Sequence, residues 1–407
     1  MYLISKEDRS LKGEINISGS KSESNRLLII RAYTNFFKII NLSDSDDTNT
    51  LISALESNDE EINIGHAGTA MRFLTSYFSS TQNSSKILTG SERMKQRPIS
   101  ILVDALNYIG ADIEYIDKVG YPPIRLKGKL ISNYTVSLPA NVSSQYLSSL
   151  MMLGISLSEG LIINLSTKIT SLPYIKMTKE LIERVGGKIF IQPDKIIVEP
   201  ILENKISDQT VESDWSSASY FYSLVALSDF SEITISSFFK KSIQGDSRIV
   251  ELYKQFGVET KFRDNKIYLK KNKIVLPDSI SINLENNPDL AQTIVVTCLG
   301  LGVDCDLQGL HTLKIKETDR LLALKKEIEK FDVDRVDVSD QSITLKNNSD
   351  LKTGISIDTY NDHRMAMSFA PLSLINPIII NNPEVVSKSY SNFWNDLKLL
   401  GFKISKK

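Results

Sequence analysis

Six apolar segments of the sequence each begin with residues that carry charge or hydrogen-bond donors. Their starts are Lys21-Ser22, Gly68-Thr69, Ser143-Ser144-Gln145, Ser216-Ser217, Asp289 and Asp362-His363-Arg364. If each segment is a helix, its first turn exposes unpaired N–H groups, which can bind an anion. Ser, Asn and Asp are also the ordinary N-capping residues, and for any single helix capping is the better interpretation. Six such ends with Arg or Lys nearby favour a cleft that binds multiply charged anions.

Another concentration of charge lies at Lys316–Arg320 (KETDR), directly before an amphipathic pattern. By composition alone it is typical of a solvated helix cap, with Thr318 or Asp319 as the capping residue. The segment Gly19–Ser22 (GSKS) resembles a phosphate loop but lacks the adjacent Gly-Lys pair and the earlier glycine of the Walker pattern. A nucleoside triphosphatase is therefore disfavoured.

The composition gives the chain no global field for binding nucleic acid or an acidic membrane. Lys and Arg total 48, and Asp and Glu total 49, in 407 residues. Two cysteines, Cys298 and Cys305, and three histidines without metal-ligand spacing predict a reducing compartment, no disulfide framework and no metal site. The N-terminus has no signal-peptide pattern, and no apolar run is long enough to span a membrane. We expect a soluble, cytoplasmic protein with neither nucleic acid nor membrane as a partner.

One pattern recurs five times: an amphipathic helix, one turn residue and an alternating strand. The turn residues are Gly110, Gly186, Gly257, Asp332 and Gly401, spaced by 76, 71, 75 and 69 residues. Apolar residues at three- and four-residue steps give each helix one buried stripe. The turn residue then supplies the left-handed backbone that ends the helix.

The six apolar segments alternate with these copies and are apolar nearly all round after their first turn, so we expect them to be buried. That burial disfavours a solenoid, whose helices lie at the surface. We predict an α/β (α+β) chain of two lobes with three repeat units each. The passages near residues 18–20 and 212–214 have the composition of hinges.

Four motifs in order along the chain resemble those of the EPSP synthase family, the 3-phosphoshikimate 1-carboxyvinyltransferases. They are Gly19–Arg26 (GSKSESNR), Ala67–Arg72 (AGTAMR), Lys316–Arg320 (KETDR) and Tyr360–Met367 (YNDHRMAM). The resemblance covers essentially the whole chain. It implies a monomer of two lobes, each with three βαβαββ-type units whose helix N-termini face the cleft between the lobes. One lobe would comprise residues 1–18 and 214–407, and the other residues 19–213.

The same resemblance implies the reaction. Phosphoenolpyruvate would transfer its enolpyruvyl group to the 5-hydroxyl of shikimate 3-phosphate, giving 5-enolpyruvylshikimate 3-phosphate and phosphate, the sixth shikimate-pathway step on the way to chorismate. Both substrates carry phosphate and carboxylate groups, which suits a site rich in Arg and Lys. No metal or organic cofactor is implied.

The family pattern also implies the residues that bind each substrate. Phosphoenolpyruvate would contact Lys21, Gly68, Arg97, Gln145, Arg320, Arg364 and Lys388. Shikimate 3-phosphate would contact Lys21, Ser22, Arg26, Ser143, Ser144, Gln145, Ser171, Asp289 and Lys316, with Tyr174 as a further candidate.

Two carboxylates among these cations can divide the acid–base work. We expect Asp289 to accept the proton of the 5-hydroxyl and Glu317 to protonate the methylene carbon of phosphoenolpyruvate. Lys21 would assist the departure of phosphate. The chain departs from the family pattern at His66 and Phe73, which replace a common Asn and a common Pro beside the phosphoenolpyruvate pocket. Both bear on the response to glyphosate, which mimics phosphoenolpyruvate in this family.

Two alternatives compete with this interpretation. A UDP-N-acetylglucosamine enolpyruvyl transferase would share the fold and the donor, but its pattern has Lys-Asn where this chain has Lys21-Ser22. It also usually has a loop cysteine in the first lobe, and no cysteine precedes Cys298. A non-catalytic anion-binding homologue would be expected to lose Asp289, Glu317 or Lys21, and the sequence retains all three.

Overall fold

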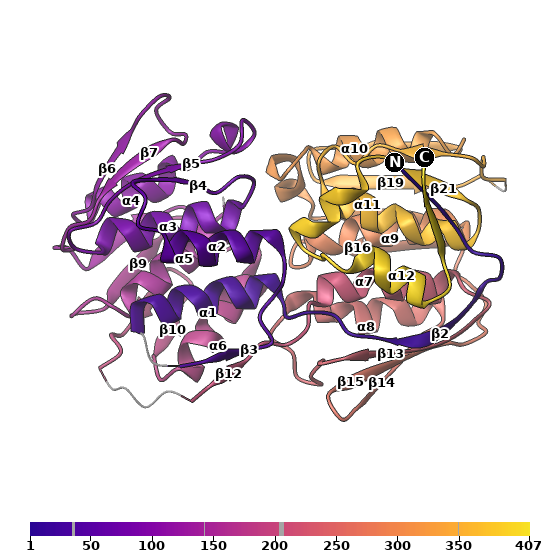
Figure 1. Ribbon diagram of the computed structural model, residues 1–407, viewed down its shortest axis with the longest axis horizontal. Coiled ribbons are helices and arrows are strands. Elements are labelled where there is room, and N and C mark those ends of the chain that lie inside the picture. Colours follow the sequence, from indigo (N-terminus) through magenta and orange to yellow (C-terminus); the bar gives the residue numbers. More distant parts are fainter. Residues whose placement is uncertain (35–36, 142, 203–206, 349) are drawn as a thin grey trace. The chain divides into compact units, whose positions relative to one another are not determined.

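The computed structural model describes residues 1–34, 37–141, 143–202, 207–348 and 350–407. The chain divides into two compact units. The terminal unit comprises Met1–Gly19 and Glu212–Lys407 and holds both ends of the chain, whereas the inserted unit comprises Ser20–Val211 (Figure 1). An antiparallel bridge joins Gly19 to Ser213 where the chain leaves and re-enters the terminal unit. None of the helices in these described ranges is long and apolar enough to cross a membrane.

The inserted unit alternates helices with short strands. Its helices are α1 Lys21–Thr34, α2 Asp46–Glu56, α3 Gly68–Ser80, α4 Ser100–Tyr108, α5 Ser144–Gly154 and α6 Leu172–Arg184, with a 3-10 turn, η1, at Met94–Gln96. Its strands are β3 Ile39–Ile40, β4 Glu61–Asn63, β5 Ser85–Thr89, β6 Asp112–Tyr115, β7 Ile124–Lys127, β8 Thr135–Leu138, β9 Leu161–Leu165, β10 Ile189–Ile191, β11 Lys195–Val198 and β12 Gln209–Thr210.

The terminal unit repeats this alternation. Its helices are α7 Trp215–Leu227, α8 Ile249–Leu252, α9 Ala291–Leu301, α10 Arg320–Glu329, α11 His363–Phe369 and α12 Phe393–Leu399. Its 3-10 turns are η2 Gly245–Arg248, η3 Tyr253–Phe256, η4 Pro288–Leu290, η5 His311–Ile315, η6 Ala370–Leu374 and η7 Pro383–Lys388. Its strands are β1 Tyr2–Ser5, β2 Ser10–Ile15, β13 Phe230–Ser236, β14 Val258–Arg263, β15 Lys266–Lys271, β16 Ser279–Asn283, β17 Asp304–Gln308, β18 Arg335–Val338, β19 Ser342–Lys346, β20 Ser356–Ile357, β21 Ile378–Ile380 and β22 Lys403–Lys406.

Five sheets share one pairing plan, in which an outer strand pairs in parallel with its neighbour and the remaining pairs are antiparallel. Their orders are β4-β5-β7-β6, β8-β9-β11-β10, β2-β13-β15-β14, β16-β17-β19-β18 and β20-β21-β1-β22. The N-terminal segment supplies β1 and β2 to two of these sheets. The predicted α/β (α+β) class and βαβαββ unit are thereby confirmed. The remaining sheet of the described residues departs from the plan, because it pairs only β3 with β12.

The five predicted turn residues all adopt the left-handed backbone. The φ angles are 109° at Gly110, 90° at Gly186, 79° at Gly257, 62° at Asp332 and 87° at Gly401. At Gly257 the requirement is also steric, since an added Cβ would lie 2.5 Å from the carbonyl oxygen of Asn272. The recurrence in the sequence therefore records a real helix end, at which glycine has no steric cost.

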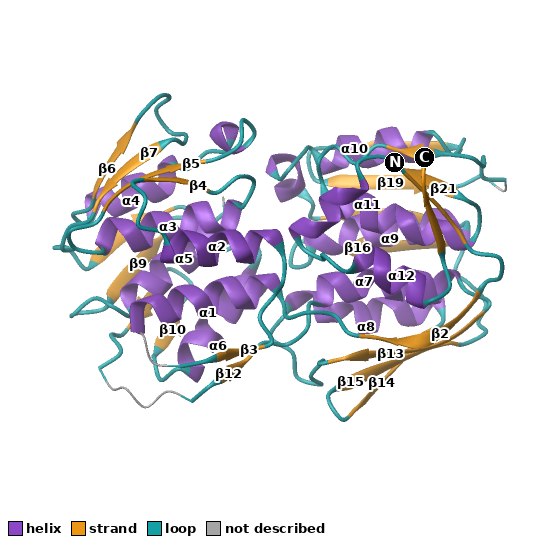
Figure 2. Ribbon diagram, viewed as in Figure 1, coloured by secondary structure: helices purple, strands orange, loops and turns teal. Residues whose placement is uncertain are grey.

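The helices predicted to be buried form the interior of each unit, with the sheets around them (Figure 2). Within α7, Ser216 is the one residue that is not buried, and α9 is buried from Ala291 to Leu299. In the inserted unit α5 is buried from Tyr146 to Gly154 and packs on α3 and α6. A helix that is apolar all round has to lie in such an interior.

Serine and threonine hydroxyls join the buried helices to one another. In the terminal unit Thr297 Oγ1 on α9 lies 2.8 Å from both Ser223 Oγ on α7 and the Tyr253 hydroxyl. In the inserted unit Ser149 Oγ on α5 lies 2.7 Å from Ser76 Oγ on α3. These side chains satisfy one another, so their burial does not carry the cost of unpaired polar groups.

Substitution of Thr297 by valine should therefore destabilise the terminal unit. The valine keeps the shape but leaves the Tyr253 hydroxyl and Ser223 without their shared partner, which costs about 1–3 kcal/mol. Urea unfolding of Thr297→Val measures the loss, and Thr353→Val, at an exposed position in the same unit, serves as the control. Equal stability of the two variants would contradict the role given to the hydroxyl network.

Candidate functional site

Arg320, the first residue of α10, is the centre of a charged cluster in the terminal unit. Its Nε donates to Asp362 at 2.7 Å, its Nη1 to Asp289 at 2.9 Å and its Nη2 to Glu317 at 2.9 Å. The guanidinium is only 2% exposed. Burial alone lowers the pKa of Arg320, but the carboxylates of Asp362, Glu317 and Asp289 together raise it above its ordinary value. Arg320 is therefore a permanent buried cation.

Two further cations bind the same carboxylates. Arg364 on α11 lies 3.2 Å from the Asp289 carboxylate and donates to the Asp289 carbonyl oxygen at 3.3 Å. Lys388, at the end of η7, lies 3.1 Å from Glu317. Asp289 thus binds two arginines, and Glu317 binds an arginine and a lysine. Three carboxylates and three cations neutralise one another in this cluster.

Two aspartates cap the helices that carry the cluster arginines, and one of them also belongs to the cluster. Asp362 is the N-cap of α11 and accepts from the Arg364 backbone N–H at 2.9 Å while it binds Arg320. Asp319 caps α10, accepting from Leu321 and Leu322 at 3.2 Å. The capping alternative for Asp319 is therefore confirmed. Capping by Asp362 and Asp319 orients the starts of both helices, from which Arg320 and Arg364 reach the carboxylates.

A further carboxyl, Asp246 on η2, lies beside the cluster. Ser216 Oγ donates to it and accepts from Arg364 Nη2 at 3.4 Å. Burial, together with the negative charge of Asp289, raises the pKa of Asp246 from 3.8 to about 6, although Arg364 opposes the shift.

In the inserted unit, Lys21 and Arg26 both lie on α1. Lys21 is the first residue of the helix and forms a 3.1 Å ion pair with Asp47. Arg26 is 2% exposed and donates to Thr178 Oγ1 at 2.7 Å, to Ser148 Oγ at 3.1 Å and to the Ser22 carbonyl at 2.9 Å. Burial lowers the pKa of Arg26 to about 10, with the interactions of Tyr174 and Glu23 opposing the shift.

Aromatic rings lie on Arg26 as well. The guanidinium carbon is 5.5 Å from the centre of the Phe73 ring and 5.7 Å from that of Tyr174. Phe73, one of the departures from the family pattern, therefore contacts a residue expected to bind shikimate 3-phosphate. His66, the other departure, is exposed and its Nδ1 lies 2.8 Å from Ser91 Oγ.

Gly68 and Arg97 lie in direct contact. A Cβ built on Gly68 would approach Arg97 Nη1 to 2.4 Å, so a larger residue there would displace the guanidinium from its present position. Arg72, one turn further along α3, donates to the carbonyl oxygens of Gly68 at 3.2 Å and Pro98 at 3.1 Å. It therefore fixes the backbone on both sides of the Gly68–Arg97 contact.

The remaining predicted residues of this unit lie at helix starts. Ser143 caps α5 by accepting from the Gln145 backbone at 3.3 Å, and Ser144 follows it as the first helical residue. The Gln145 side chain donates to Thr69 Oγ1 at 3.2 Å, which joins the start of α5 to the start of α3. Ser171 precedes α6 with a left-handed backbone, φ 54°.

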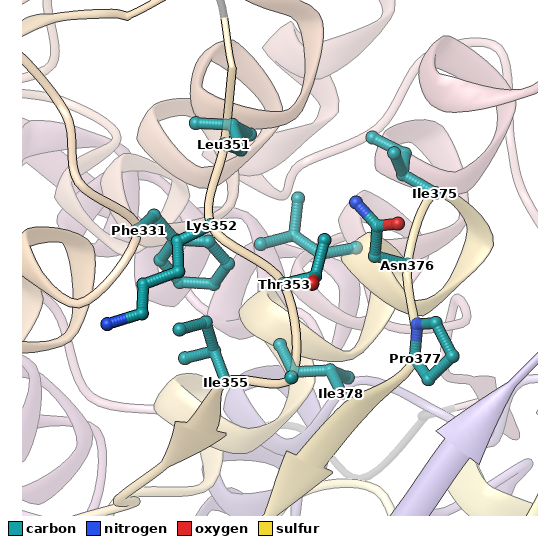
Figure 3. A pocket seen from close by; sticks show the side chains of 11 residues that line it. Phe331, Leu351, Lys352, Thr353, Ile355, Ile375, Asn376, Pro377 and Ile378 are labelled. Carbon is teal, nitrogen blue, oxygen red and sulfur yellow. The ribbon is translucent and has the colours of Figure 1, made fainter.

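A separate pocket of the terminal unit lies away from these charges. It is lined by side chains that include Phe331, Ile355, Ile375 and Ile378 (Figure 3). Its volume of about 20 Å³ has room for a water molecule but not for a substrate. None of the predicted site residues lines it.

Comparisons with known proteins identify the family. The model of EPSP synthase (3-phosphoshikimate 1-carboxyvinyltransferase) matches residues 51–397. The 3-phosphoshikimate 1-carboxyvinyltransferase of Bacteroides fragilis strain YCH46 is 44% identical over 406 residues, which cover 99% of this chain and 98% of that one. The chain belongs to the EPSP synthase family. The enzyme of the same name from Colwellia psychrerythraea is 33% identical and covers 95% of this chain and 96% of its own.

Solved structures support the EPSP synthase fold. EPSP synthase from Acinetobacter baumannii aligns with a TM-score of 0.75 at 18% identity, covering 100% of this chain and 99% of that one. The enolpyruvyl transferase NikO from Streptomyces tendae aligns with a TM-score of 0.74 at 14% identity, covering 99% and 98%. The family match makes the chain an enzyme of the carboxyvinyltransferase class. The UDP-N-acetylglucosamine and non-catalytic alternatives are not favoured.

The structure brings the predicted EPSP synthase residues together within each unit. Asp289, Glu317, Arg320, Arg364 and Lys388 form one cluster, and Lys316 precedes it directly. In the inserted unit Lys21, Ser22 and Arg26 share α1, Gly68 contacts Arg97, and Gln145 contacts Thr69 beside Gly68. Across the described residues, no group of three or more His, Cys, Asp or Glu side chains could hold a metal ion.

Sequence reasoning missed four polar residues that contact the predicted ones, namely Asp47, Arg72, Thr178 and Asp246, and it named Asp362 only as a helix start. Arg72 and Asp362 lie inside motifs that marked the family, and their charge was the available signal. Asp246 lies in the segment Gln244-Gly245-Asp246, which also resembles the family pattern, but Thr178 had no such signal before the fold placed it beside Arg26.

Substitution of Asp246 by asparagine should stabilise the protein at neutral and higher pH. The folded-state pKa is raised, so the stability that this carboxyl contributes is present at low pH and is lost as the pH rises from 3.8 through about 6. Asparagine still accepts from Ser216 but never ionises. We expect Asp246→Asn to raise the free energy of unfolding by up to about 3 kcal/mol at pH 8, with a smaller gain at pH 5.

Denaturant unfolding at the two pH values measures this gain. Asp278→Asn, at an exposed aspartate of the same unit, is the matched control and should change stability little at either pH. A destabilised Asp246→Asn at pH 8 would show that the ionised carboxylate is required by Arg364 and Ser216.

Proposed function

We propose that the terminal-unit cluster and the polar residues of the inserted unit form the active site of an EPSP synthase. The enzyme transfers the enolpyruvyl group of phosphoenolpyruvate to the 5-hydroxyl of shikimate 3-phosphate and releases phosphate. The observation that carries the assignment is the buried cluster in which Arg320, Arg364 and Lys388 surround Asp289 and Glu317. It supplies cations for an anionic donor and two carboxylates for proton transfer.

Phosphoenolpyruvate binding is an exchange of partners in this proposal. Lys388 and Arg364 already bind Glu317 and Asp289, so an incoming phosphate or carboxylate has to replace a protein carboxylate at each cation. Planar guanidinium groups bind such oxygens with two parallel hydrogen bonds. Lys21, Gly68, Arg97 and Gln145 complete the donor site from the inserted unit.

The exchange prepares Glu317 to act as an acid. With Arg320 and Lys388 beside it, Glu317 is held as a carboxylate. When phosphoenolpyruvate takes Lys388, Glu317 loses one of its two cations and faces an anion, which favours proton uptake. The protonated Glu317 then gives its proton to the methylene carbon, and the carbon beside it becomes electrophilic.

Asp289 accepts the proton of the 5-hydroxyl as its oxygen attacks that carbon. After phosphoenolpyruvate takes Arg364, Arg320 remains beside Asp289 and holds its carboxylate in the ionised form that a base needs. The resulting tetrahedral intermediate carries both the phosphate and the shikimate oxygen. Glu317, now a carboxylate, takes back a methyl proton as the C–O bond to phosphate breaks, which regenerates the double bond in the product. Lys21 assists the departing phosphate, which can take the proton held by Asp289.

Shikimate 3-phosphate binds to the inserted unit, with Asp289 and Lys316 added from the terminal unit. Ser143, Ser144, Ser171 and Gln145 offer hydroxyl, amide and backbone donors to the phosphate, together with Lys21 and Ser22. Arg26 suits the carboxylate, because Thr178, Ser148 and two rings fix its guanidinium. Tyr174, a further candidate for contact with this substrate, lies beside the Arg26 guanidinium.

The residues expected to bind the substrates come from both units. The reaction therefore requires both units to contact the same pair of bound substrates. We propose that the lobes, residues 1–18 with 214–407 and residues 19–213, close over the substrates through hinges near 18–20 and 212–214. Closure excludes water and strengthens the electrostatic contacts. The enzyme acts as a cytoplasmic monomer, without a cofactor or a nucleic-acid partner.

Phosphate release tests the function. Purified protein is incubated with phosphoenolpyruvate and shikimate 3-phosphate in a buffer with a metal chelator, and UDP-N-acetylglucosamine replaces the acceptor in a parallel reaction. Release that depends on shikimate 3-phosphate is expected. Release only with UDP-N-acetylglucosamine, or none from folded protein that binds both anions, would overturn the proposal.

Glu317→Gln should lower kcat by about 10²- to 10⁴-fold, since the amide cannot transfer the proton. KM for phosphoenolpyruvate should not rise, because Lys388 no longer has to be taken from a carboxylate. Steady-state kinetics with both substrates measures the two constants. The control is Glu329→Gln, at an exposed glutamate on α10. A variant with normal kcat would exclude Glu317 as the proton donor.

Arg26→Lys should raise KM for shikimate 3-phosphate by about 10- to 100-fold, because lysine keeps the charge but loses the fork that Thr178 and Ser148 orient. KM for phosphoenolpyruvate should change much less. Arg31→Lys, further along α1, is the matched control. If both KM values rise equally in Arg26→Lys, the residue supports the unit as a whole and does not bind this substrate.

A further inference from the structure

The turn at residues 358–362, directly before α11, forms hydrogen bonds with α10 at two places. Asp362, at the end of the turn, binds Arg320 at the start of α10. Earlier in the turn, the Tyr360 hydroxyl donates to Glu327 Oε1 at 2.7 Å and the Asp358 backbone N–H donates to Glu327 Oε2 at 3.0 Å. Arg320 and Glu327 are seven residues apart, so they lie on the same face of the helix about two turns from each other.

Glu327 is unusual because its carboxylate lies in the protein interior. Its side chain is fully buried, and a third donor, Lys330 Nζ, reaches it at 2.6 Å. Lys330 also donates to the Ser356 carbonyl at 3.0 Å and lies 3.1 Å from the Asp358 carboxylate. A buried carboxylate is costly unless it is paired and hydrogen-bonded. Two of the three donors to Glu327, the Asp358 N–H and the Tyr360 hydroxyl, belong to the turn. The third, Lys330, also contacts β20 and the turn.

The turn has a backbone that needs such fastening. Tyr360 and Asn361 are consecutive non-glycine residues with positive φ angles of 52° and 55°. Residues in this conformation persist only where the surrounding structure holds them, and they often lie at functional sites. The next residue, Asp362, sets the start of α11 and with it the position of Arg364.

We propose that Glu327 and Tyr360 are positioning residues for the donor-binding arginines. Their hydrogen bond fixes the strained turn on α10, so that Asp362 meets Arg320 and Arg364 is aimed at Asp289. Neither residue touches the cluster, and both act through Asp362. This inference rests on the proposed function, because it concerns the arginines assigned to phosphoenolpyruvate.

The test uses Tyr360→Phe, which removes the hydroxyl and keeps the ring that packs on the core. Glu327 retains Lys330 and the Asp358 N–H in this variant, so we expect the protein to fold with little change in Tm. KM for phosphoenolpyruvate should rise about tenfold, while KM for shikimate 3-phosphate changes less than about twofold. Tyr222→Phe is the matched control, because its buried hydroxyl lies 2.9 Å from Thr260 Oγ1 in the same unit, away from the cluster.

Glu327→Gln provides a second route and a test of the pair. If the two residues act through one hydrogen bond, the double variant should raise KM for phosphoenolpyruvate no further than the larger single effect. A lowered Tm with both KM values unchanged, in Tyr360→Phe or in Glu327→Gln, would assign the pair to folding alone and overturn the inference. So would multiplicative KM effects in the double variant. Inactive wild-type enzyme would instead overturn the proposed function.

Discussion

The enclosure of Arg320 by three carboxylates is the interaction on which the terminal unit depends. A buried guanidinium with no partner would be too costly to fold, and three buried carboxylates without it would repel one another. The partners come from three distant places in the chain: Asp289 before α9, Glu317 before α10 and Asp362 before α11. Folding therefore brings three helix starts to one point, and the ion pairs make each start depend on the others.

The repeated βαβαββ unit makes this convergence possible. Each βαβαββ repeat contributes one buried helix. The hydroxyls of Thr297, Ser223 and Ser149 let these helices approach closely without unsatisfied polar groups. The helix ends then lie at the margin of the interior, where a charged side chain such as Arg364 can be buried on one side and still meet a substrate on the other. The same construction in the inserted unit leaves Lys21 and Arg26 on successive turns of α1.

The sequence alone was sufficient for the features that depend on local patterns. The left-handed helix ends at Gly110 and Asp332 and the buried character of α9 follow from residue type and periodicity. The chemistry at Arg320 does not, because the composition of Lys316–Arg320 is that of a solvated cap and only a family resemblance pointed to a site. What buries Arg320 is a set of partners 31 and 42 residues away in the chain, at Asp289 and Asp362. No local pattern encodes such distances.

Mutual neutralisation within the cluster also bears on specificity. A ligand that offers a single negative group can replace one protein carboxylate at one cation, but the displaced carboxylate then loses about as much as the ligand gains. A ligand with two anionic groups at the right separation can bind Lys388 and Arg364 together, and the displaced Glu317 can escape its penalty by taking up a proton. Phosphoenolpyruvate has this form, since its phosphate and carboxylate flank the carbon that reacts. Under the proposed function, the charge balance that keeps the free cluster stable also disfavours inorganic phosphate and simple carboxylates, and it links donor binding to the protonation that the chemistry requires.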